Sequence, residues 1–355
     1  MLKIQIKGRA RVAVCDDEYM PLKVAINGFG RIGRILYRTY LKNPSPNVQF
    51  VAANDVMNAS TMAYLLKYDS VHGNLGSSIS IDGNTIKVDG MQLQTLMVRD
   101  PAQLPWKGLN IDVVVESTGL FTDRESASKH LTAGARKVII SAPAKGPDAT
   151  IIPGVTDDKY DPKRHILLSI GSCTTNCVVP IATVLHRKFG IERAYMITTH
   201  AYTNDQRLHD LPHSDPRRAR AAALSIIPTS TGAARTVGEV IPELKGKIDG
   251  MSLRVPVADV SVLNLVAVLK AETAVEEVNK AFVDAANGEM KRILKAETEP
   301  TVSVDYIGDT HSAVVDTLST VVVDKKLTNV TAFYDNEIGF SNRMLDMLEL
   351  IAKKG

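Results

Sequence analysis

The sequence of 355 residues contains only three cysteines, few aromatic residues and almost no net charge. Three cysteines do not support a disulfide framework and fit a reducing compartment, so we expect a cytoplasmic protein. A formal net charge of +3 excludes a dedicated nucleic-acid or membrane-surface binder. No apolar run approaches the roughly 18 residues that a membrane-spanning helix needs, which excludes an integral membrane protein.

The chain does contain a hydrophobic fraction of 45%, which excludes a disordered protein. Because a single core rarely grows beyond about 250–300 residues, the length predicts two domains. Residues 1–21 lack the apolar core and cleavage site of a secretory signal, and Met20 offers an alternative translation start. We expect residues 1–21 to be an N-terminal extension without a function of its own.

Strand and helix patterns alternate through the first part of the chain. An apolar strand pattern at 22–26 is followed by a helix pattern at 31–41 and a second strand at 48–53. This βαβ unit places its two strands in parallel. Further strands are expected at 79–81, 85–88, 111–116 and 137–141, and a helix at 124–133. The alternation predicts an α/β fold with a Rossmann-type doubly wound parallel sheet.

After Cys173 the pattern changes to long, Val-rich, alternating segments with few helices between them. Adjacent strands of this kind predict a largely antiparallel mixed sheet in an α+β domain. The strands are expected at 193–199, 251–257, 260–270, 302–307 and 319–323, and helices at 178–187 and 275–286. An amphipathic pattern at 342–353 predicts a C-terminal helix.

The first strand ends in Gly28-Phe29-Gly30-Arg31-Ile32-Gly33, which matches the dinucleotide-binding pattern G-x-G-x-x-G. Gly28 permits a tight turn, Gly30 lets the backbone approach a pyrophosphate, and Gly33 lets helix and strand pack closely. Asp55 ends the next strand, where its carboxylate would bind ribose hydroxyls and repel a 2′-phosphate. The motif therefore predicts NAD rather than NADP; the alternative is a glycine-rich turn without a ligand.

Cys173 follows an apolar strand pattern at 165–170 and lies near the start of a helix, where the helix dipole stabilises a thiolate. Its hydroxyl-bearing neighbours favour an exposed nucleophile, although a pair of buried structural thiols is an alternative. A metal site shared with Cys177 would need two further ligands, which the sequence does not supply. We expect Cys177 to be a small buried residue or an oxidation partner.

His200 ends the strand that follows this helix. A histidine at a strand end is usually a capping or core residue. With a thiol on a neighbouring element, it is also a candidate general acid–base.

Several motifs in order resemble the phosphorylating glyceraldehyde-3-phosphate dehydrogenases. The matching segments are INGFGRIGR at 26–34, SCTTNC at 172–177, HAYTNDQ at 200–206, IIPTSTGAA at 226–234, RVP at 254–256 and YDNE at 334–337. The resemblance runs from about residue 22 to the C-terminus. It implies a cofactor domain of residues 22–172 and 336–355, and a catalytic and oligomerisation domain of residues 173–335.

The resemblance also implies a reaction. The Cys173 thiolate would attack the aldehyde of glyceraldehyde 3-phosphate, and His200 would lower the pKa of that thiol and act as general acid–base. Hydride transfer to NAD would leave a thioester on Cys173, which inorganic phosphate would cleave to release 1,3-bisphosphoglycerate. The family likewise implies a homotetramer, with residues 208–223 as an interface loop and Leu211-Pro212 favouring NAD.

The family's binding residues can be placed on this sequence one by one. For the cofactor, the resemblance implies backbone amides of Arg31 and Ile32, contacts from Arg99 and Ser141, and carboxamide binding by Asn336. For the substrate phosphate it implies Thr203 and Arg254, with Asp205 orienting its neighbour. For the attacking phosphate it implies Ser172, Thr174, Arg218, Thr231 and Gly232. It implies no metal.

The sequence departs from the family pattern at Ser169-Ile170-Gly171, before the Ser-Cys pair, and at Phe340, where a tyrosine is common. Residues 311–316 and 342–346 look similar to erythrose-4-phosphate dehydrogenase, which is the alternative on the same scaffold. A nonenzymatic nucleotide- or RNA-binding protein is a third interpretation, which the presence of Cys173 and His200 disfavours.

Overall fold

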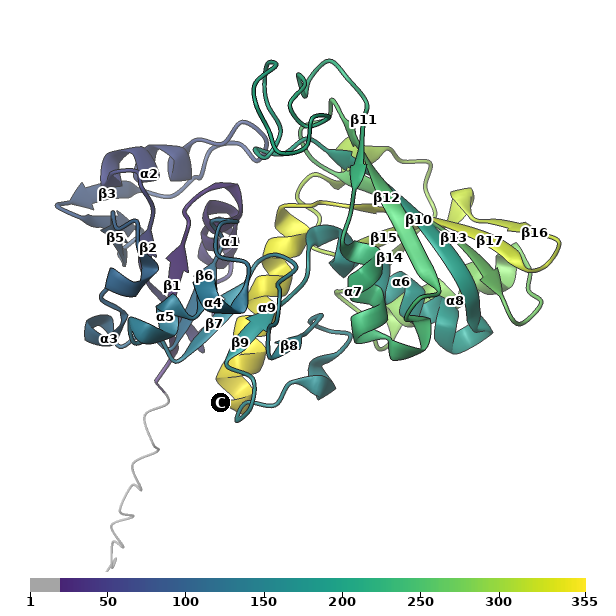
Figure 1. The fold of residues 1–355 in the computed structure, drawn as a ribbon, viewed down its shortest axis with the longest axis horizontal. Helices are drawn as coiled ribbons and strands as arrows, with labels where there is room; N and C mark the ends of the chain where they lie inside the picture. The colour runs from purple at the N-terminus through teal and green to yellow at the C-terminus, as the bar shows by residue number, and fades with distance from the viewer. Residues whose placement is uncertain (1–19) are drawn as a thin grey trace, which may run out of the picture.

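The structure, a computed structural model, describes residues 20–355, which form two β-sheets lying side by side (Figure 1). The expected N-terminal extension, residues 1–21, lies outside the described residues except for residues 20 and 21. The C-terminal helix α9 (Ile338–Lys354) packs against the first helix, α1 (Arg31–Lys42), and against α6 (Cys173–Phe189). It thereby returns the end of the chain to the first sheet.

The first sheet is parallel except at one edge, where a meander pairs antiparallel. Its strand order is β3-β4-β5-β2-β1-β6-β7-β9-β8, so the chain winds outward from β1 in both directions. This confirms the predicted doubly wound sheet. The strands are β1 (Leu22–Asn27), β2 (Val48–Asn54), β3 (Ile79–Asp82), β4 (Thr85–Val88), β5 (Met91–Leu96), β6 (Val113–Glu116), β7 (Lys137–Ile140), β8 (Ala149–Thr150) and β9 (Leu167–Ser169).

The connections of this sheet contain mostly short helices. The helix expected at 124–133 is divided into two turns, because Asp123 caps the first turn by accepting from Ser126 N at 2.9 Å and a second turn begins after Ser128. The helical segments here are α2 (Ala59–Lys67), α3 (Trp106–Leu109), α4 (Arg124–Ala127) and α5 (Lys129–Thr132), with 3-10 turns η1 (Pro101–Gln103) and η2 (Asp157–Lys159).

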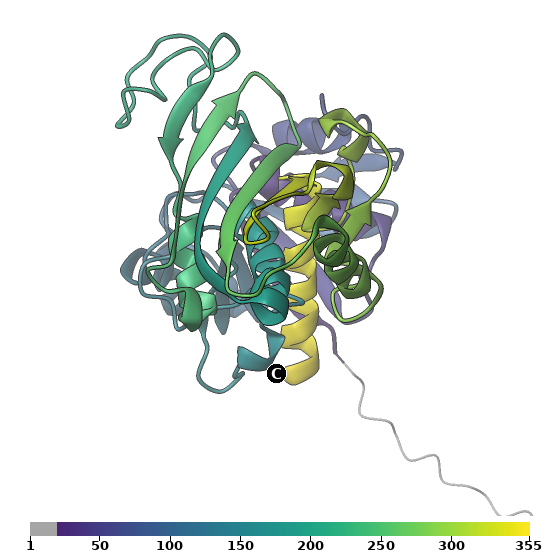
Figure 2. The same cartoon turned by 90° about the vertical axis from the view of Figure 1, so that its right-hand side faces the viewer.

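The second sheet is mixed and mostly antiparallel, as predicted, with order β11-β12-β10-β13-β17-β15-β14 and β16 paired to β17. Its exceptions are two parallel pairs, β10 with β12 and β14 with β15. Figure 2 shows this sheet from its own side, with helices packed against it. The strands are β10 (Ile191–Ala201), β11 (Ile227–Ser230), β12 (Ile248–Val255), β13 (Ser261–Leu269), β14 (Leu294–Glu297), β15 (Ala313–Asp316), β16 (Val321–Val323) and β17 (Leu327–Tyr334).

The helical segments of this part include α7 (Ala233–Val240) and α8 (Val275–Asn287). The 3-10 turns are η3 (Pro242–Leu244), η4 (Ser303–Tyr306) and η5 (Thr317–Ser319). The expected strand at 302–307 was wrong, because the Asp305 carboxylate accepts from Val302 N at 2.8 Å and closes a 3-10 turn. Val302 and Val304 are exposed, so their apolar alternation does not reflect a buried sheet face. The expected strand at 319–323 shortens to β16 for a similar reason, since Asp316 caps η5.

Helix α6 begins five residues earlier than the helix pattern at 178–187 predicts. It is buried along most of its length, and it forms the centre of the core cluster between the second sheet and α7 and α8. Among residues 20–355, no helix combines the length and the apolar character that crossing a bilayer requires.

Candidate active site

The glycine motif forms the turn between β1 and α1. Gly28 has φ +94°, and a Cβ there would lie 2.6 Å from Thr118 N. A Cβ on Gly33 would lie 2.2 Å from the Gly28 carbonyl oxygen, so both positions require glycine. Gly30 caps α1 and faces open space. The N-terminal amides of α1 are therefore accessible to an anionic group such as a pyrophosphate.

A hollow of about 300 Å³ opens beside this turn, at the carboxyl ends of β1, β2 and β6, where the strand order reverses. Open α/β sheets bind ligands at such switch points. Asp55 and Arg99 both line the hollow, and Asp55 Oδ2 accepts from Phe29 N at 2.7 Å. Its lining residues are Asn27, Gly28, Gly30, Asn54, Asp55, Val56, Val98, Arg99, Ser117, Thr118, Leu120 and Phe121.

Two aspects of this hollow differ from the sequence expectations. Ser141 lies at the end of β7, outside the hollow, where its amide donates to the Glu116 carbonyl at 3.0 Å. The loop 117–121 after β6 borders the hollow, which the sequence analysis did not predict. The topology could have predicted this loop. β6 lies beside β1, so the loop that leaves its carboxyl end must border the switch point.

Cys173 is the first residue of α6, as expected from its sequence context. Ser172 caps the helix, because its Oγ accepts from Thr175 N at 3.1 Å. Gly171 has φ +68°, and a Cβ there would lie 2.9 Å from the Thr175 side chain. The departure from the family pattern at this position therefore suits a left-handed turn that presents Cys173 at the helix start.

The Cys173 Sγ lies 3.3 Å from His200 Nε2, within hydrogen-bonding distance of a sulfur. His200 comes from the end of β10 and is 4% exposed, and its Nδ1 lies 2.7 Å from the Ala201 carbonyl oxygen. The structure thus brings together the two residues that the sequence nominated as nucleophile and acid–base. Cys177 lies one helical turn further along α6 and is fully buried.

Burial determines the protonation of this pair. Burial raises the pKa of Cys173. The positive charge of Arg254 and the hydrogen bonds from Thr174 lower it, but by less. Burial first, and then the positive charge of Arg254, lower the pKa of His200 to about 3. Burial therefore favours the neutral thiol and the neutral imidazole. The lowering of the Cys173 pKa by His200 that the family resemblance implies stays a prediction.

Tyr334, at the end of β17, was not among the predicted site residues. Its hydroxyl lies 2.9 Å from Thr174 Oγ1 and 2.8 Å from Thr198 Oγ1, so it links α6, β10 and β17 beneath the Cys–His pair. Its ring meets that of His200 edge-on, with the ring centroids 6.0 Å apart. Tyr334 belongs to the YDNE segment together with Asn336. That position in the sequence did not distinguish a core tyrosine from a site residue.

Asn336 begins the connection from β17 to α9. Its Oδ1 accepts from Ser261 Oγ at 2.8 Å, and the same Ser261 Oγ accepts from Ala201 N at 3.1 Å. Asn336 is thereby tied to the end of the strand that carries His200.

Two arginines approach the Cys–His pair. Arg254 lies in β12 directly beside His200 in the parallel register, and its Nη1 is 2.6 Å from His200 Nδ1. Arg218 donates from Nη1 to Asp205 Oδ2 at 2.6 Å and from Nε to Thr229 Oγ1 at 2.9 Å. Asp205 therefore orients Arg218. The charges of Arg254 and, to a smaller extent, Arg218 lower the pKa of His200.

The hydroxyl residues expected at the phosphate sites lie around the same region, with one difference. Thr203 lies just beyond β10, and its amide donates to Gln206 Oε1 at 3.3 Å. Thr231 Oγ1 accepts from Ala233 N at 3.2 Å, and Gly232 caps α7. Thr174 is buried, with its hydroxyl bonded to Tyr334 and acting on Cys173, so it faces the nucleophile and the core.

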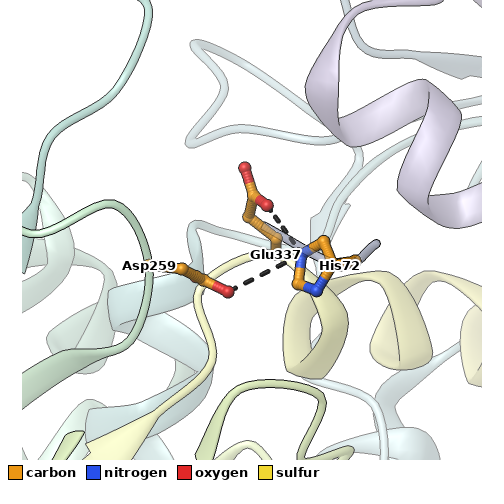
Figure 3. Close-up of side chains that lie close together, drawn as sticks. All are labelled: His72, Asp259 and Glu337. Carbon is orange, nitrogen blue, oxygen red and sulfur yellow. Dashed lines mark hydrogen bonds and ion pairs between the residues drawn. The ribbon is translucent and has the colours of Figure 1, made fainter. Parts of the chain in front are cut away.

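A buried cluster of His72, Asp259 and Glu337 lies where the two sheets meet (Figure 3). His72 Nε2 is 2.9 Å from Glu337 Oε2 and 3.6 Å from Asp259 Oδ2. These groups resemble a cation site, but Arg31 bonds to both oxygens of Glu337 and its charge would repel a metal ion. The cluster joins the start of α1 to the start of α9. The expectation of no metal ligand stays a prediction.

The fold and the site together define a nicotinamide-dinucleotide dehydrogenase with a Cys–His pair at the end of β10, an interior strand of its second sheet. The chain belongs to the glyceraldehyde-3-phosphate dehydrogenase family. The model of that family's NAD binding domain matches residues 22–124, and the model of its C-terminal domain matches residues 172–336.

Similar proteins cover nearly the whole chain. It is 57% identical to the glyceraldehyde-3-phosphate dehydrogenase of Geobacillus stearothermophilus over 336 residues, which are 95% of this chain and 100% of the relative. It is 54% identical over 336 residues to glyceraldehyde-3-phosphate dehydrogenase 1 of Bacillus subtilis, with the same coverage of both chains. It is 52% identical to the Mycobacterium leprae glyceraldehyde-3-phosphate dehydrogenase over 339 residues, 94% of this chain and 99% of the relative.

Proposed function

We propose that this protein oxidises glyceraldehyde 3-phosphate with NAD and inorganic phosphate, forming 1,3-bisphosphoglycerate through a thioester on Cys173. The single observation that carries the proposal is the Cys173 Sγ to His200 Nε2 approach of 3.3 Å at the start of a helix. A thiol beside an imidazole suits covalent attack on an aldehyde, and the family relationship supports this substrate.

In the proposed reaction, His200 Nε2 accepts the Cys173 proton as sulfur attacks the aldehyde carbon. His200 then donates this proton from Nε2 to the resulting oxyanion, and it accepts the same proton back from the hydroxyl as the carbonyl re-forms. Bound NAD supplies the hydride acceptor. When phosphate cleaves the thioester, Cys173 leaves as a thiolate, which the first amides of α6 and the Arg254 charge stabilise.

Arg254 and Arg218 provide the positive charges for the two phosphate groups. Arg254 with Thr203 would hold the phosphate of the substrate. Arg218, oriented by Asp205, would hold the attacking phosphate together with Ser172, Thr231 and Gly232. Thr174 would contribute chiefly by its contacts with Cys173, because its hydroxyl is turned toward the core.

The cofactor would lie across the hollow beside the glycine turn. The α1 amides at Arg31, Ile32 and Gly33 suit its pyrophosphate, and the hollow that Asp55 and Arg99 line suits the adenosine end. Asp55 Oδ1, which accepts from Met57 N at 3.3 Å, retains capacity for ribose hydroxyls. We assign Asn336 to the nicotinamide carboxamide because it connects the end of β17 to Ser261.

We assign residues 22–172 and 336–355 to the cofactor domain and residues 173–335 to the catalytic domain, and the protein itself to a cytoplasmic homotetramer. The long segment between β10 and β11 carries exposed large aliphatic side chains, among them those of Leu208, Leu211, Leu224 and Ile226. A monomer rarely leaves such side chains clustered in water, so another copy is the expected cover. Sedimentation equilibrium should give four times the chain mass.

The deciding assay is NADH formation from glyceraldehyde 3-phosphate, with and without inorganic phosphate or arsenate. Rapid turnover should require one of these anions. Erythrose 4-phosphate serves as the comparison substrate, and a clearly higher kcat/KM for it would replace the proposal with the alternative dehydrogenase. Equal kcat/KM with NADP would contradict the role given to Asp55.

A further inference from the structure

The carboxyl group of Glu116 lies beneath the cofactor hollow, at the end of β6, and is not part of the lining. The residue is only 1% exposed. Its Oε1 accepts from Thr118 N at 2.8 Å and also bonds to the Thr118 hydroxyl. Its Oε2 lies 2.6 Å from Asn27 Nδ2 and 2.9 Å from His130 Nε2. Both oxygens of this buried carboxyl group are therefore surrounded by polar neighbours.

The direction of the bond between His130 and Glu116 follows from Trp106. Trp106 Nε1 lies 3.0 Å from His130 Nδ1, and an indole nitrogen can only donate. Within the part of the chain that the structure describes, Trp106 is the one hydrogen-bond partner of Nδ1. The ring hydrogen therefore lies on Nε2, where the available acceptor is Glu116, because Asn27 Nδ2 at 3.4 Å is itself a donor.

The Asn27 amide is oriented toward Glu116 by a second series of hydrogen bonds. Val98 N donates to Asn54 Oδ1 at 2.9 Å, and Asn54 Nδ2 donates to Asn27 Oδ1 at 2.7 Å. A main-chain amide cannot accept, so it fixes the orientation of both side-chain amides. Asn27 Nδ2 is thereby left to donate to Glu116.

The loop after β6 supplies the remaining donors. Leu120 N donates to Thr118 Oγ1 at 3.0 Å, which leaves the hydroxyl hydrogen of Thr118 for Glu116. Thr118 N also packs directly on the glycine turn, since a Cβ on Gly28 would lie 2.6 Å from it. The carboxyl group of Glu116 therefore determines where this loop lies against the turn.

The groups that these bonds orient form the walls of the hollow. Five of them line it, namely Asn27, Asn54, Val98, Thr118 and Leu120. They come from the segments that follow β1, β2, β5 and β6. All the donors require an acceptor on both oxygens of residue 116. A carboxylate provides that, whereas the amide of a glutamine would turn an NH2 group toward one pair of donors.

We infer that Glu116 is a positioning residue for NAD, which holds the walls of the hollow in place and is itself oriented from the core by His130 and Trp106. The inference rests on the proposed function, which places the cofactor in this hollow. Glu116 acts through its neighbours and lies in the first sheet, whereas Cys173 and His200 begin α6 and end β10. A change at Glu116 therefore weakens cofactor binding and leaves the chemical step intact.

The first test compares Glu116→Gln with the unmodified full-length protein after removal of bound NAD. Calorimetric titration should give a Kd for NAD that is higher by roughly tenfold or more, because buried donors lose their acceptor and the walls shift. The KM for NAD should rise as well, while kcat at saturating NAD and the KM for glyceraldehyde 3-phosphate stay near the parent values. A role confined to core stability would lower the melting temperature without this division, and an unchanged Kd would overturn the inference.

A matched pair of variants at His130 tests the network from a fully buried position outside the hollow. Both lose the acceptor for Trp106, so they differ in the donor to Glu116. His130→Gln can place an NH2 group near the position of Nε2 and should keep most of the affinity for NAD. His130→Leu removes the donor and should raise the Kd severalfold. Equal Kd values in the two variants would overturn the part assigned to His130.

Asp112→Asn is the control for the change from carboxyl to amide. Asp112 lies just before the other end of β6, where its Oδ2 accepts from Lys23 N at 2.8 Å, outside the hollow. Its Kd for NAD should equal that of the parent. Trp106 is the one tryptophan of the sequence and is fully buried, so its emission reports whether each variant is folded. If Glu116→Gln emits as an exposed indole does, the His130 pair decides.

Arg99→Met separates failure of the inference from failure of the proposed function. Arg99 lines the hollow, so this variant should bind NAD more weakly whether or not Glu116 has the assigned role. A Kd raised in Arg99→Met and unchanged in Glu116→Gln would overturn the inference alone. An unchanged Kd in both variants would show that NAD binds elsewhere and would overturn the proposed cofactor site as well.

Discussion

The hydroxyl of Tyr334 lies 2.9 Å from that of Thr174, although 160 positions separate the two residues. Thr174 is the neighbour of Cys173 at the start of α6, and Tyr334 ends the central strand β17. Because Tyr334 also bonds to Thr198 in β10, one buried hydroxyl fixes the helix that carries the thiol relative to the strand that carries His200. The geometry of the Cys–His pair therefore depends on a residue that contacts neither reacting atom.

Tyr334→Phe tests this relationship. Loss of the hydroxyl leaves two buried threonine hydroxyls without their shared partner, so we expect the free energy of unfolding to fall by about 1–3 kcal/mol. The kcat should fall while the Kd for NAD stays unchanged, because the cofactor hollow does not include Tyr334. Chemical denaturation measures the free energy of unfolding, and steady-state kinetics measures kcat. Tyr306→Phe is the control, since it removes a buried hydroxyl that bonds to Thr301, and it should leave kcat unchanged.

Cys173→Ser should abolish turnover, because a serine hydroxyl beside a weakly basic His200 is a far poorer nucleophile than a thiol. We expect a loss of at least about a thousandfold in kcat. NAD binding, followed by fluorescence quenching, should persist. The control is Cys177→Ala, a fully buried position whose sulfur faces the core, which should retain activity. Full activity in Cys173→Ser would remove Cys173 as the nucleophile.

Gly171→Ala should destabilise the turn before Cys173. The new Cβ would combine a φ of +68° with a 2.9 Å contact to Thr175, and we expect a loss of about 1–3 kcal/mol in the free energy of unfolding. Since this turn presents the nucleophile, kcat should fall as well. Gly246→Ala separates strain from contact, because Gly246 has φ +75° and a Cβ there would meet no atom within 4 Å. Equal losses in the two variants would show that the Thr175 contact has no effect.

Asp259→Asn should change how stability depends on pH. Burial, with the negative charges of Asp335 and Glu337, raises the pKa of Asp259 above its ordinary value. As pH rises above about 4, the unfolded chain loses this proton while the folded protein keeps it, so the raised pKa lowers stability increasingly until the folded pKa is passed. The Asp259→Asn variant has no carboxyl group at this position, so its stability is not lowered in this way as pH rises.

Thermal unfolding of both proteins between pH 4 and pH 8 measures the difference. The melting temperatures should be similar at the acidic end, and the variant should melt higher at pH 8. His200 is the same in both proteins, so its lowered pKa cancels from the comparison. The exposed Asp249→Asn serves as control and should give a difference that does not vary with pH. A variant that is less stable at pH 8 would contradict the burial argument.

The elements that the sequence predicted well are those with local signals. The glycine turn, the strands beside it and α8 follow from residue spacing alone, because turn geometry and helical periodicity depend on neighbouring residues. The prediction at 302–307 was wrong where a single carboxylate, that of Asp305, closed a turn against the apolar alternation. The start of α6 was placed too late because a Ser172 cap extended the helix through a polar segment.

By itself, the sequence determined a dinucleotide turn with Asp55 at the end of the next strand, a thiol at a helix start and a histidine at a strand end, because each depends on a short segment of chain. Only the tertiary structure decided that Arg254 lies against His200. That contact requires β10 and β12 to pair in parallel with these two residues in register, and a shift of one residue would turn the arginine to the other face of the sheet. It also decided the burial that raises the pKa of Cys173 and lowers that of His200, since desolvation depends on everything packed around the two side chains.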